Sequence, residues 1–261
     1  MSKILAFTCT HGDRPFLPGL IPNMRGTAGQ WFDWLVVLSG ASDEQQAIAE
    51  QFLHSEDRNG IQYLINWPEN RGQHHATAAA LDLARSKGYD WLLRIDDDIQ
   101  PKTKRWLKKM LDRNRQMHHE KGLLGSDKCI LAPKIIGLKN PPQPRGVIEG
   151  FDFPAEEMTF TGGGLRLHPV ALLEGYEPPL YSPRGRDDPQ SLARFLGSYE
   201  DSTVPQKGIF VRFPDIRVVH RTAELEEMDT EHAAKVRRTN WYWPWLGRWD
   251  CPQPETEEAK S

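Results

Sequence analysis

The feature that most constrains this chain is an apolar, strand-length run that ends in three successive aspartates. The segment Trp91–Ile95 leads into Asp96, Asp97 and Asp98, and Pro101 follows. The pattern predicts a buried strand that Pro101 stops before a helix begins. In an extended chain, residues i and i+2 point the same way, so Asp96 and Asp98 are expected to share one face.

A pair of carboxylates on one strand face favours a divalent cation. Two carboxylates about 4 Å apart repel by roughly 4 kcal/mol at an effective dielectric of 20. A bound cation turns that repulsion into attraction, and a site made of oxygen ligands suits Mn²⁺ or Mg²⁺. The alternative interpretation of an isolated acidic run is a solvated turn. The surrounding sequence therefore has to decide between the two.

Length and composition indicate one globular domain of ordinary character. The chain has 261 residues, of which 38% are hydrophobic and 26% are charged. Its net charge of −3 provides no general attraction to nucleic acid or to anionic membranes. The three cysteines show no metal-binding spacing, and no stretch of about 18 apolar residues could span a membrane. We therefore expect a cytoplasmic protein.

Strand-like and helix-like segments alternate along the first hundred residues. Strands are expected at 4–8, 34–38, 61–65 and 91–95, and helices at 43–53 and 74–87. Such alternation is typical of a parallel sheet with right-handed crossovers. Sheets of this kind bind ligands at the carboxyl ends of their strands, which is where the aspartate run lies.

The turn after the first expected strand excludes one large class of nucleotide-binding enzymes. An NAD or FAD enzyme would carry a GxGxxG pattern at this turn, and Cys9–Pro15 has none. The loop instead offers the polar side chains of Thr10, His11 and Arg14, which are suited to hold the base or phosphates of a nucleotide.

The second half of the chain carries a basic helix, a long loop and a glycine run. Between Lys102 and Lys121 there are eight Lys or Arg residues and two acids. We interpret this as a solvated helix face, and a contact with nucleic acid or lipid headgroups is the less favoured interpretation.

Residues 139–158 are expected to form a long loop. The glycines of 162–164 allow a backbone to lie close to a ligand. Further strands are expected at 129–136, 208–213 and 216–219, and a helix at 169–173.

In this order the segments resemble the family 2 glycosyltransferases of the GT-A fold, over about residues 3–220. A lone DxD motif is a weak signal, so the resemblance depends on the order of all the pieces. They are the polar loop Thr8–Arg14, the turn in Val37–Asp43, Asn70-x-Gly72, the DxD motif in Leu93–Asp98, the glycine-rich Gly162–Arg166, Gly175–Glu177, and Phe213–His220. The aromatic and basic run Lys235–Trp243 is also similar to a segment of some members.

The resemblance implies an α/β protein with a GT-A-type single domain, in which a mostly parallel central sheet is flanked by helices. This domain would comprise residues 1–222, with a nucleotide-sugar-binding half at 1–101 and an acceptor-side half at 102–222. A Trp-rich C-terminal extension, helical and aromatic, would follow at 223–251. The tail at 252–261 is polar and is expected to be disordered.

The resemblance also implies roles for the acidic residues. Asp98 and His220 would ligate Mn²⁺ or Mg²⁺, and Asp96 would join the metal site or contact the ribose or sugar of a nucleotide-diphosphate sugar, with Asp97 nearby. Further donor contacts are implied for Thr8, Thr10, Arg14, Ser39 and Asn70. Ser39 stands where many members carry an aspartate that holds the base or ribose, so the identity of the donor stays open.

Two acidic pairs compete for the role of the catalytic base that would deprotonate a hydroxyl acceptor. Asp188 can cap a helix that has Pro189 at its first position, which favours the pair Asp187-Asp188. Pro205 would interrupt the helix expected after Asp201, so the pair Glu200-Asp201 is the alternative.

The acceptor side is implied to include the glycine run and the C-terminal aromatic segment. Gly163, Gly164, Trp243 and Trp245 are the candidates. Four tryptophans fall within residues 241–249. Tryptophan rings stack on sugars and bases, but they also pack an extension onto a domain, and packing is the preferred interpretation here.

Two other classes of protein compete with a glycosyltransferase. A nucleotidyltransferase acting on sugar phosphates would begin with a glycine-rich basic loop, which Thr8–Pro15 does not supply. A non-catalytic carbohydrate-binding module would have no use for three adjacent carboxylates.

Overall fold

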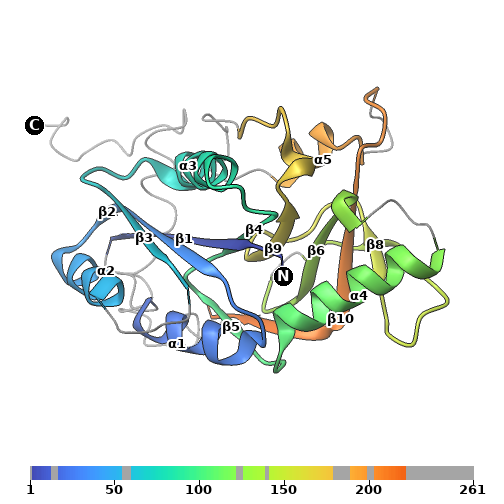
Figure 1. Ribbon diagram of the computed structural model, residues 1–261, viewed down its shortest axis with the longest axis horizontal. Coiled ribbons are helices and arrows are strands. Elements are labelled where there is room, and N and C mark those ends of the chain that lie inside the picture. Colours follow the sequence, from blue (N-terminus) through green and yellow to red (C-terminus); the bar gives the residue numbers. More distant parts are fainter. Residues whose placement is uncertain are drawn as a thin grey trace, which may run out of the picture.

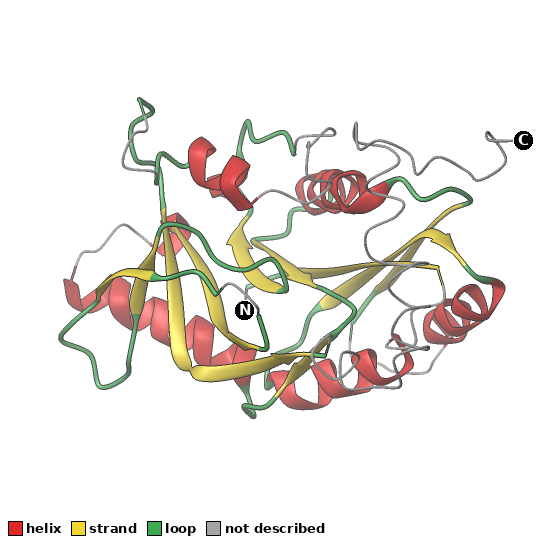
Figure 2. Cartoon of the chain, turned by 180° about the vertical axis from the view of Figure 1, so that it is seen from behind, coloured by secondary structure: helices red, strands yellow, loops and turns green. Residues whose placement is uncertain are grey.

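The computed structural model describes residues 2–12, 17–54, 60–121, 126–138, 141–178, 189–198 and 203–221. In this part of the chain a single sheet lies between two layers of helices, as Figures 1 and 2 show from opposite sides. One face is covered by α1 (Leu17–Ala28), α2 (Asp43–His54) and α4 (Trp106–Lys121). The other is covered by α3 (Gly72–Ser86) and α5 (Pro189–Phe195).

The first half of the sheet is parallel, as the alternation of strands and helices predicts. It comprises β1 (Ile4–Gly12), β2 (Asp33–Ala41), β3 (Gln62–Trp67) and β4 (Trp91–Ile95), in the spatial order β3-β2-β1-β4. Because helices cover both faces, the central strands are apolar on both sides. The carboxyl ends of these four strands therefore lie along one edge of the sheet.

The second half of the sheet is mixed, with both parallel and antiparallel pairs. Its strands are β6 (Cys129–Ile136), β7 (Pro144–Val147), β8 (Glu156–Met158), β9 (Leu165–Pro169) and β10 (Ile209–His220). The order continues as β4-β9-β6-β10-β8-β7, and β9 runs antiparallel to both β4 and β6. The short strand β5 (Ile99–Pro101) pairs with the end of β10. Strands β6 and β10 pair in parallel, and the other pairs of this half are antiparallel. Two 3₁₀ turns, η1 (Ser126–Lys128) and η2 (Ala171–Leu173), complete this half.

The prediction for the aspartate run is wrong in its local geometry. Strand β4 ends at Ile95, and residues 96–98 form a turn in which the Ile99 N–H lies 3.4 Å from the Asp96 carbonyl oxygen. Pro101 does not open a helix, because it belongs to β5 and pairs with Val218; α4 begins at Trp106. Pairing with β10, which lies far away in sequence, holds residues 99–101 extended.

Three predictions in the second half are also wrong. The long loop expected at 139–158 contains β7 and β8, which pair with each other. The helix expected at 169–173 is reduced to η2, because Pro169 ends β9 opposite Trp91. The two strands expected at 208–213 and 216–219 are one strand, β10, with a register shift between Phe213 and Arg217.

Side-chain size differs between the two faces of the sheet. Towards α1 and α4 the core contains large side chains, among them Trp34 and Trp106. Towards α3 it contains Ala76, Ala80 and Ala84, which let that helix approach the strands closely. None of the helices in the described residues combines the length and the hydrophobicity that a membrane span requires. The predicted extension at 223–251 and the tail at 252–261 lie outside the described residues.

Candidate active site

Asp98 and His220 meet where β5 pairs with the end of β10. The register places His220 opposite Ile99, and the Arg221 N–H donates to the Asp98 carbonyl oxygen at 2.7 Å. The His220 Nε2 lies 3.4 Å from the Asp98 Oδ2, with the two side chains 14% and 1% exposed. The fold thus brings together the two residues that were expected to ligate a metal.

The Asp98–His220 pair fits a cation that shares its coordination with a ligand. Two adjacent ligands of an octahedral ion, each at about 2.1 Å, are about 3 Å apart, which is close to the observed separation. Within the described ranges, no three His, Cys, Asp or Glu side chains surround a common point. A Mg²⁺ site completed by substrate phosphates and water needs only one or two protein carboxylates. The pair is therefore suited to such an open site rather than to a closed protein cage.

Asp96 turns towards a different set of partners. Its Oδ1 accepts hydrogen bonds from Arg94 Nε at 3.0 Å and from Gln73 Nε2 at 2.8 Å, and its N–H donates to the Gly164 carbonyl oxygen at 2.8 Å. Burial alone would raise the pKa of Asp96, but the charge and hydrogen bond of Arg94 outweigh it and lower that pKa. The prediction that Asp96 and Asp98 share one face of an extended strand is wrong in its premise, because residues 96–98 form a turn.

Asp97 is tied to the end of β1. The Thr10 hydroxyl donates to Asp97 Oδ2 at 2.8 Å, and both side chains are buried. The Thr8 hydroxyl, also buried, accepts from the Trp34 indole N–H at 3.2 Å. These two threonines brace the strand that leads to the site, and their contact with a donor stays a prediction.

Ser39 and Asn70 hold the start of α3. The buried Ser39 hydroxyl accepts from the N–H groups of Arg71 at 2.8 Å and Gly72 at 3.3 Å, and Asn70 Oδ1 accepts from the Gly72 N–H at 2.9 Å. Backbone N–H groups at the start of a helix have no carbonyl partner within the helix, so other groups must accept their hydrogen bonds. The sequence did not reveal this cap, because the Ser39 hydroxyl reaches it from another strand.

The glycine run lies against the aspartate turn. A Cβ atom added to Gly164 would lie 2.6 Å from Ile99 Cδ1, and one added to Gly163 would lie 3.2 Å from Arg94 Nη2. The absence of side chains therefore lets this segment approach β4 and β5. An acceptor contact for Gly163 and Gly164 stays a prediction.

Sequence reasoning missed a buried basic cluster beside Asp96. Arg94 and Arg166 lie directly opposite each other on β4 and β9, and are 3% and 2% exposed. Burial and the charge of Arg94 lower the pKa of Arg166 to about 9, so it stays a cation at neutral pH. Burial and Arg94 also lower the pKa of His74 to about 4. The available signal was an arginine inside an otherwise apolar strand.

His74 predicts a specific loss of stability in mild acid. Its pKa is about 4 in the folded chain and about 6.5 when unfolded, so its contribution is full above pH 6.5 and is lost as the pH falls towards 4. At about 1.4 kcal/mol per pKa unit the loss is about 2 kcal/mol at pH 5 and about 3 kcal/mol near pH 4. Urea unfolding at pH 7.5, 6 and 5 measures it. A His74→Asn variant should show a shallower pH dependence, and an unchanged slope would contradict the assignment.

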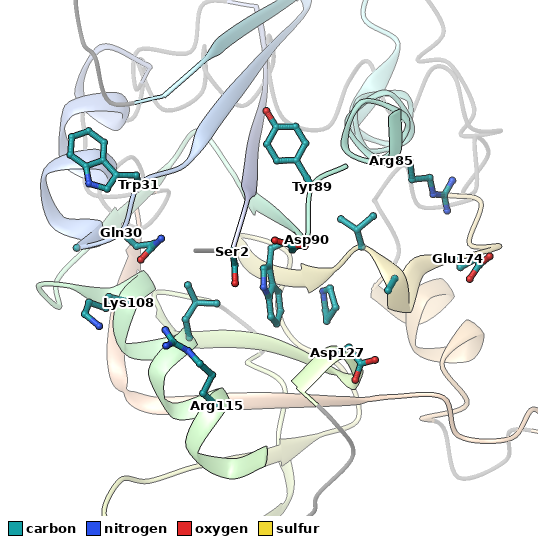
Figure 3. Close-up of a pocket in the computed structure, with 16 residues that line it drawn as sticks. Ser2, Gln30, Trp31, Arg85, Tyr89, Asp90, Lys108, Arg115, Asp127 and Glu174 are labelled. Atoms are coloured by element: carbon teal, nitrogen blue, oxygen red, sulfur yellow. The ribbon is translucent and has the colours of Figure 1, made fainter. Parts of the chain in front are cut away.

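A groove in the described part of the chain lies away from these residues. It has a volume of about 1190 Å³, and its lining includes Trp31, Tyr89, Trp91, Lys108, Arg115 and Glu174 (Figure 3). Trp91 begins β4, whereas Asp96 follows its last residue, so the groove is at the amino ends of the parallel strands. Ligands of such sheets bind at the carboxyl ends, which places the candidate site at the aspartate turn.

Several predicted site residues lie outside the described residues: Arg14, Asp188, Asp201, Trp243 and Trp245. The helix predicted to follow Asp188 is present, because α5 begins at Pro189. After Asp201, the described residues 203–208 form no helix.

The comparison with protein families agrees with this site. The family model described as Glycosyl transferase family 2 matches residues 6–119, from β1 through the aspartate turn into α4. Over these residues the chain is similar to glycosyltransferase family 2. The match confirms the resemblance that the order of motifs indicates. No curated protein sequence matches this chain.

Solved glycosyltransferases share the GT-A fold of this chain. The mannosyltransferase PcManGT from Pyrobaculum calidifontis, in complex with GDP-Man and Mn²⁺, matches with a TM-score of 0.57, 14% identity, and coverage of 94% of this chain and 66% of that one. S. aureus TarS 1-349 in complex with UDP-GlcNAc matches with a TM-score of 0.57 and 14% identity, and the match covers 99% of this chain and 69% of that one. GalNAc-T7 with UDP, GalNAc and Mn²⁺ matches with a TM-score of 0.56 and 9% identity, and the match covers 84% of this chain and 43% of that one. At such low identity the likeness establishes the fold alone, and this chain spans about two thirds of PcManGT.

Proposed function

We propose that this chain is a metal-dependent, inverting glycosyltransferase that moves a sugar from a nucleotide-diphosphate sugar to a hydroxyl acceptor. The observation that carries the proposal is the Asp98–His220 pair beside the ionised carboxylate of Asp96, at the carboxyl end of β4. Two structures of similar fold support the proposal, because PcManGT and GalNAc-T7 were each solved with a nucleotide or nucleotide sugar and Mn²⁺.

In this proposal Asp98 and His220 hold Mn²⁺ or Mg²⁺. When bound, the cation offsets the charge that develops on the diphosphate leaving group. Asp96 contacts the ribose or sugar rather than the metal, because Arg94 and Gln73 already donate hydrogen bonds to its Oδ1. Asn70, Thr10 and Arg14 are assigned to the donor side.

A carboxylate acts as the general base on the acceptor side. We assign this role to Asp188, with Asp201 as the alternative. The base takes the proton of the acceptor hydroxyl while its oxygen forms a bond to the anomeric carbon. The bond from that carbon to the diphosphate oxygen breaks on the opposite face, so the configuration inverts.

The proposed function predicts a strict requirement for a divalent cation. Purified protein incubated with UDP-, GDP- and dTDP-sugars should hydrolyse at least one donor slowly when Mn²⁺ or Mg²⁺ is present, because water can replace the acceptor. Release of the nucleoside diphosphate measures this reaction. EDTA should abolish it and excess Mn²⁺ should restore it.

Two outcomes would contradict the proposal. Full activity in the presence of EDTA would rule out the role of the cation. Absence of both turnover and nucleotide binding across the whole donor panel would rule out the transferase itself.

A further inference from the structure

The Asp96 carboxylate is clamped between α3 and β4, and the clamp engages mainly one of its oxygens. Arg94 Nε and Gln73 Nε2 both donate to Oδ1, whereas among the described residues Oδ2 has a long contact of 3.5 Å with Arg94 Nη2. The Asp96 side chain is 20% exposed. A carboxylate oxygen has two acceptor positions, so Oδ2 keeps capacity to accept a hydrogen bond from a ligand hydroxyl.

We propose that Arg94 and Gln73 are positioning residues that aim Asp96 at the sugar-nucleotide donor, and that Gly163 is a glycine to leave Arg94 room to do so. The inference rests on the proposed function, and it assigns to these three residues a role in donor binding. None of the three is expected to touch the reacting atoms.

The direction of Arg94 is fixed by its neighbours. Its guanidinium is buried, and Arg166 lies directly opposite it on β9. Because like charges repel, Arg166 disfavours any orientation in which the Arg94 guanidinium turns away from Asp96 and towards β9. Arg94 pairs instead with the carboxylate of Asp96, which lies two residues later in the chain, just after the end of β4.

Gly163 limits the space on the remaining side of Arg94. An added Cβ atom would lie 3.2 Å from Arg94 Nη2, so the guanidinium would have to shift by a few tenths of an ångström. Gly163 does not adopt a positive φ, so backbone conformation does not explain the glycine. The explanation is the close approach of the glycine segment to Arg94.

The position of Gln73 is fixed from the other side. Gln73 follows Gly72 in the first turn of α3, and that turn is held by the hydroxyl of Ser39 and the side chain of Asn70. The end of β2 therefore sets the place from which Gln73 reaches Asp96. Removing the Gln73 amide removes one bond to a charged acceptor and leaves the cap of the helix intact.

Three single variants test the positioning role: Arg94→Lys, Gln73→Ala and Gly163→Ala. Each should raise the donor KM and the Kd for the nucleoside diphosphate with Mn²⁺, by about tenfold for Arg94→Lys and Gln73→Ala. Because donor contacts contribute equally to ground state and transition state, kcat should change much less. The probe is UDP or GDP, whichever the wild-type protein binds in calorimetry.

Matched controls separate positioning from general damage. Arg212, whose Nε lies 2.6 Å from Glu156 Oε2, belongs to the β8–β10 pair, so Arg212→Lys should leave the donor KM unchanged. An added Cβ at Gly146 meets no atom within 4 Å, so Gly146→Ala should also be silent. Thermal melts of all variants report any loss of stability.

A double-mutant cycle gives the sharpest test. Lysine has no Nη2 atom, so Gly163→Ala should raise the donor KM in the wild-type background and add nothing in Arg94→Lys. Additive effects, or variants that lose stability with an unchanged KM and Kd, would overturn the inference while the proposed function stands. A wild-type protein that binds neither UDP nor GDP nor any sugar donor would overturn the proposed function and this inference with it.

Discussion

Replacing Asp98 with asparagine should lower kcat by about a thousandfold, with little change in melting temperature. Asparagine keeps the size of the side chain but removes the charge that we assign to cation binding, and lost charge stabilisation of this kind costs about 10²- to 10³-fold or more. The measurement is steady-state donor hydrolysis at several Mn²⁺ concentrations, accompanied by thermal melts.

The same substitution at Asp215 provides the control. Asp215 makes a bidentate ion pair with Arg113 on a partly exposed surface, away from the aspartate turn. Asp215→Asn should therefore lower stability slightly and leave kcat unchanged, since ion pairs at exposed positions contribute only about 0–1 kcal/mol. An Asp98→Asn enzyme with wild-type turnover at ordinary Mn²⁺ concentrations would remove Asp98 from the proposed cation site.

Replacing Trp34 with alanine should lower the free energy of unfolding by about 3–5 kcal/mol. The Trp34 side chain is 0% exposed in the core between the sheet and α1, and its ring centroid lies 5.4 Å from that of Phe32. The indole N–H also donates to the Thr8 hydroxyl. Truncation therefore opens a cavity and leaves a buried hydroxyl without this donor. Urea denaturation measures the change.

Trp34→Phe separates the two contributions. It keeps most of the ring volume and removes the hydrogen bond to Thr8, so we expect a smaller loss of about 1–3 kcal/mol. A loss below 1 kcal/mol for Trp34→Ala would show that the core at this position is not packed as the structure has it.

Local pattern was sufficient for the parallel half of the fold. Apolar runs of strand length, separated by helical segments, predict β1 to β4 and their order of connection. Helix α1 escaped this reasoning, since Pro22 and Gly26 are poor helix formers. Its stability comes instead from Leu20, Met24 and Ala28, which recur at intervals of four residues and are buried against the sheet.

The mixed half of the sheet could not be predicted from local pattern. Strand β9 is inserted between β4 and β6, and β5 is held extended only by the end of β10. Each of these pairings joins segments far apart in the chain, and strand periodicity does not specify a partner.

At the candidate site, the sequence by itself determined the chemistry: three carboxylates at the end of a buried strand, a glycine run and a closing histidine. Only the tertiary structure decided what each of them faces. Residues 96–98 form a turn instead of continuing the strand, the β5–β10 pairing brings His220 to Asp98, and α3 brings Gln73 to Asp96. The physical reason is that residue type and backbone periodicity are local properties. The direction of a side chain at the end of a strand depends instead on which distant segment pairs beside it.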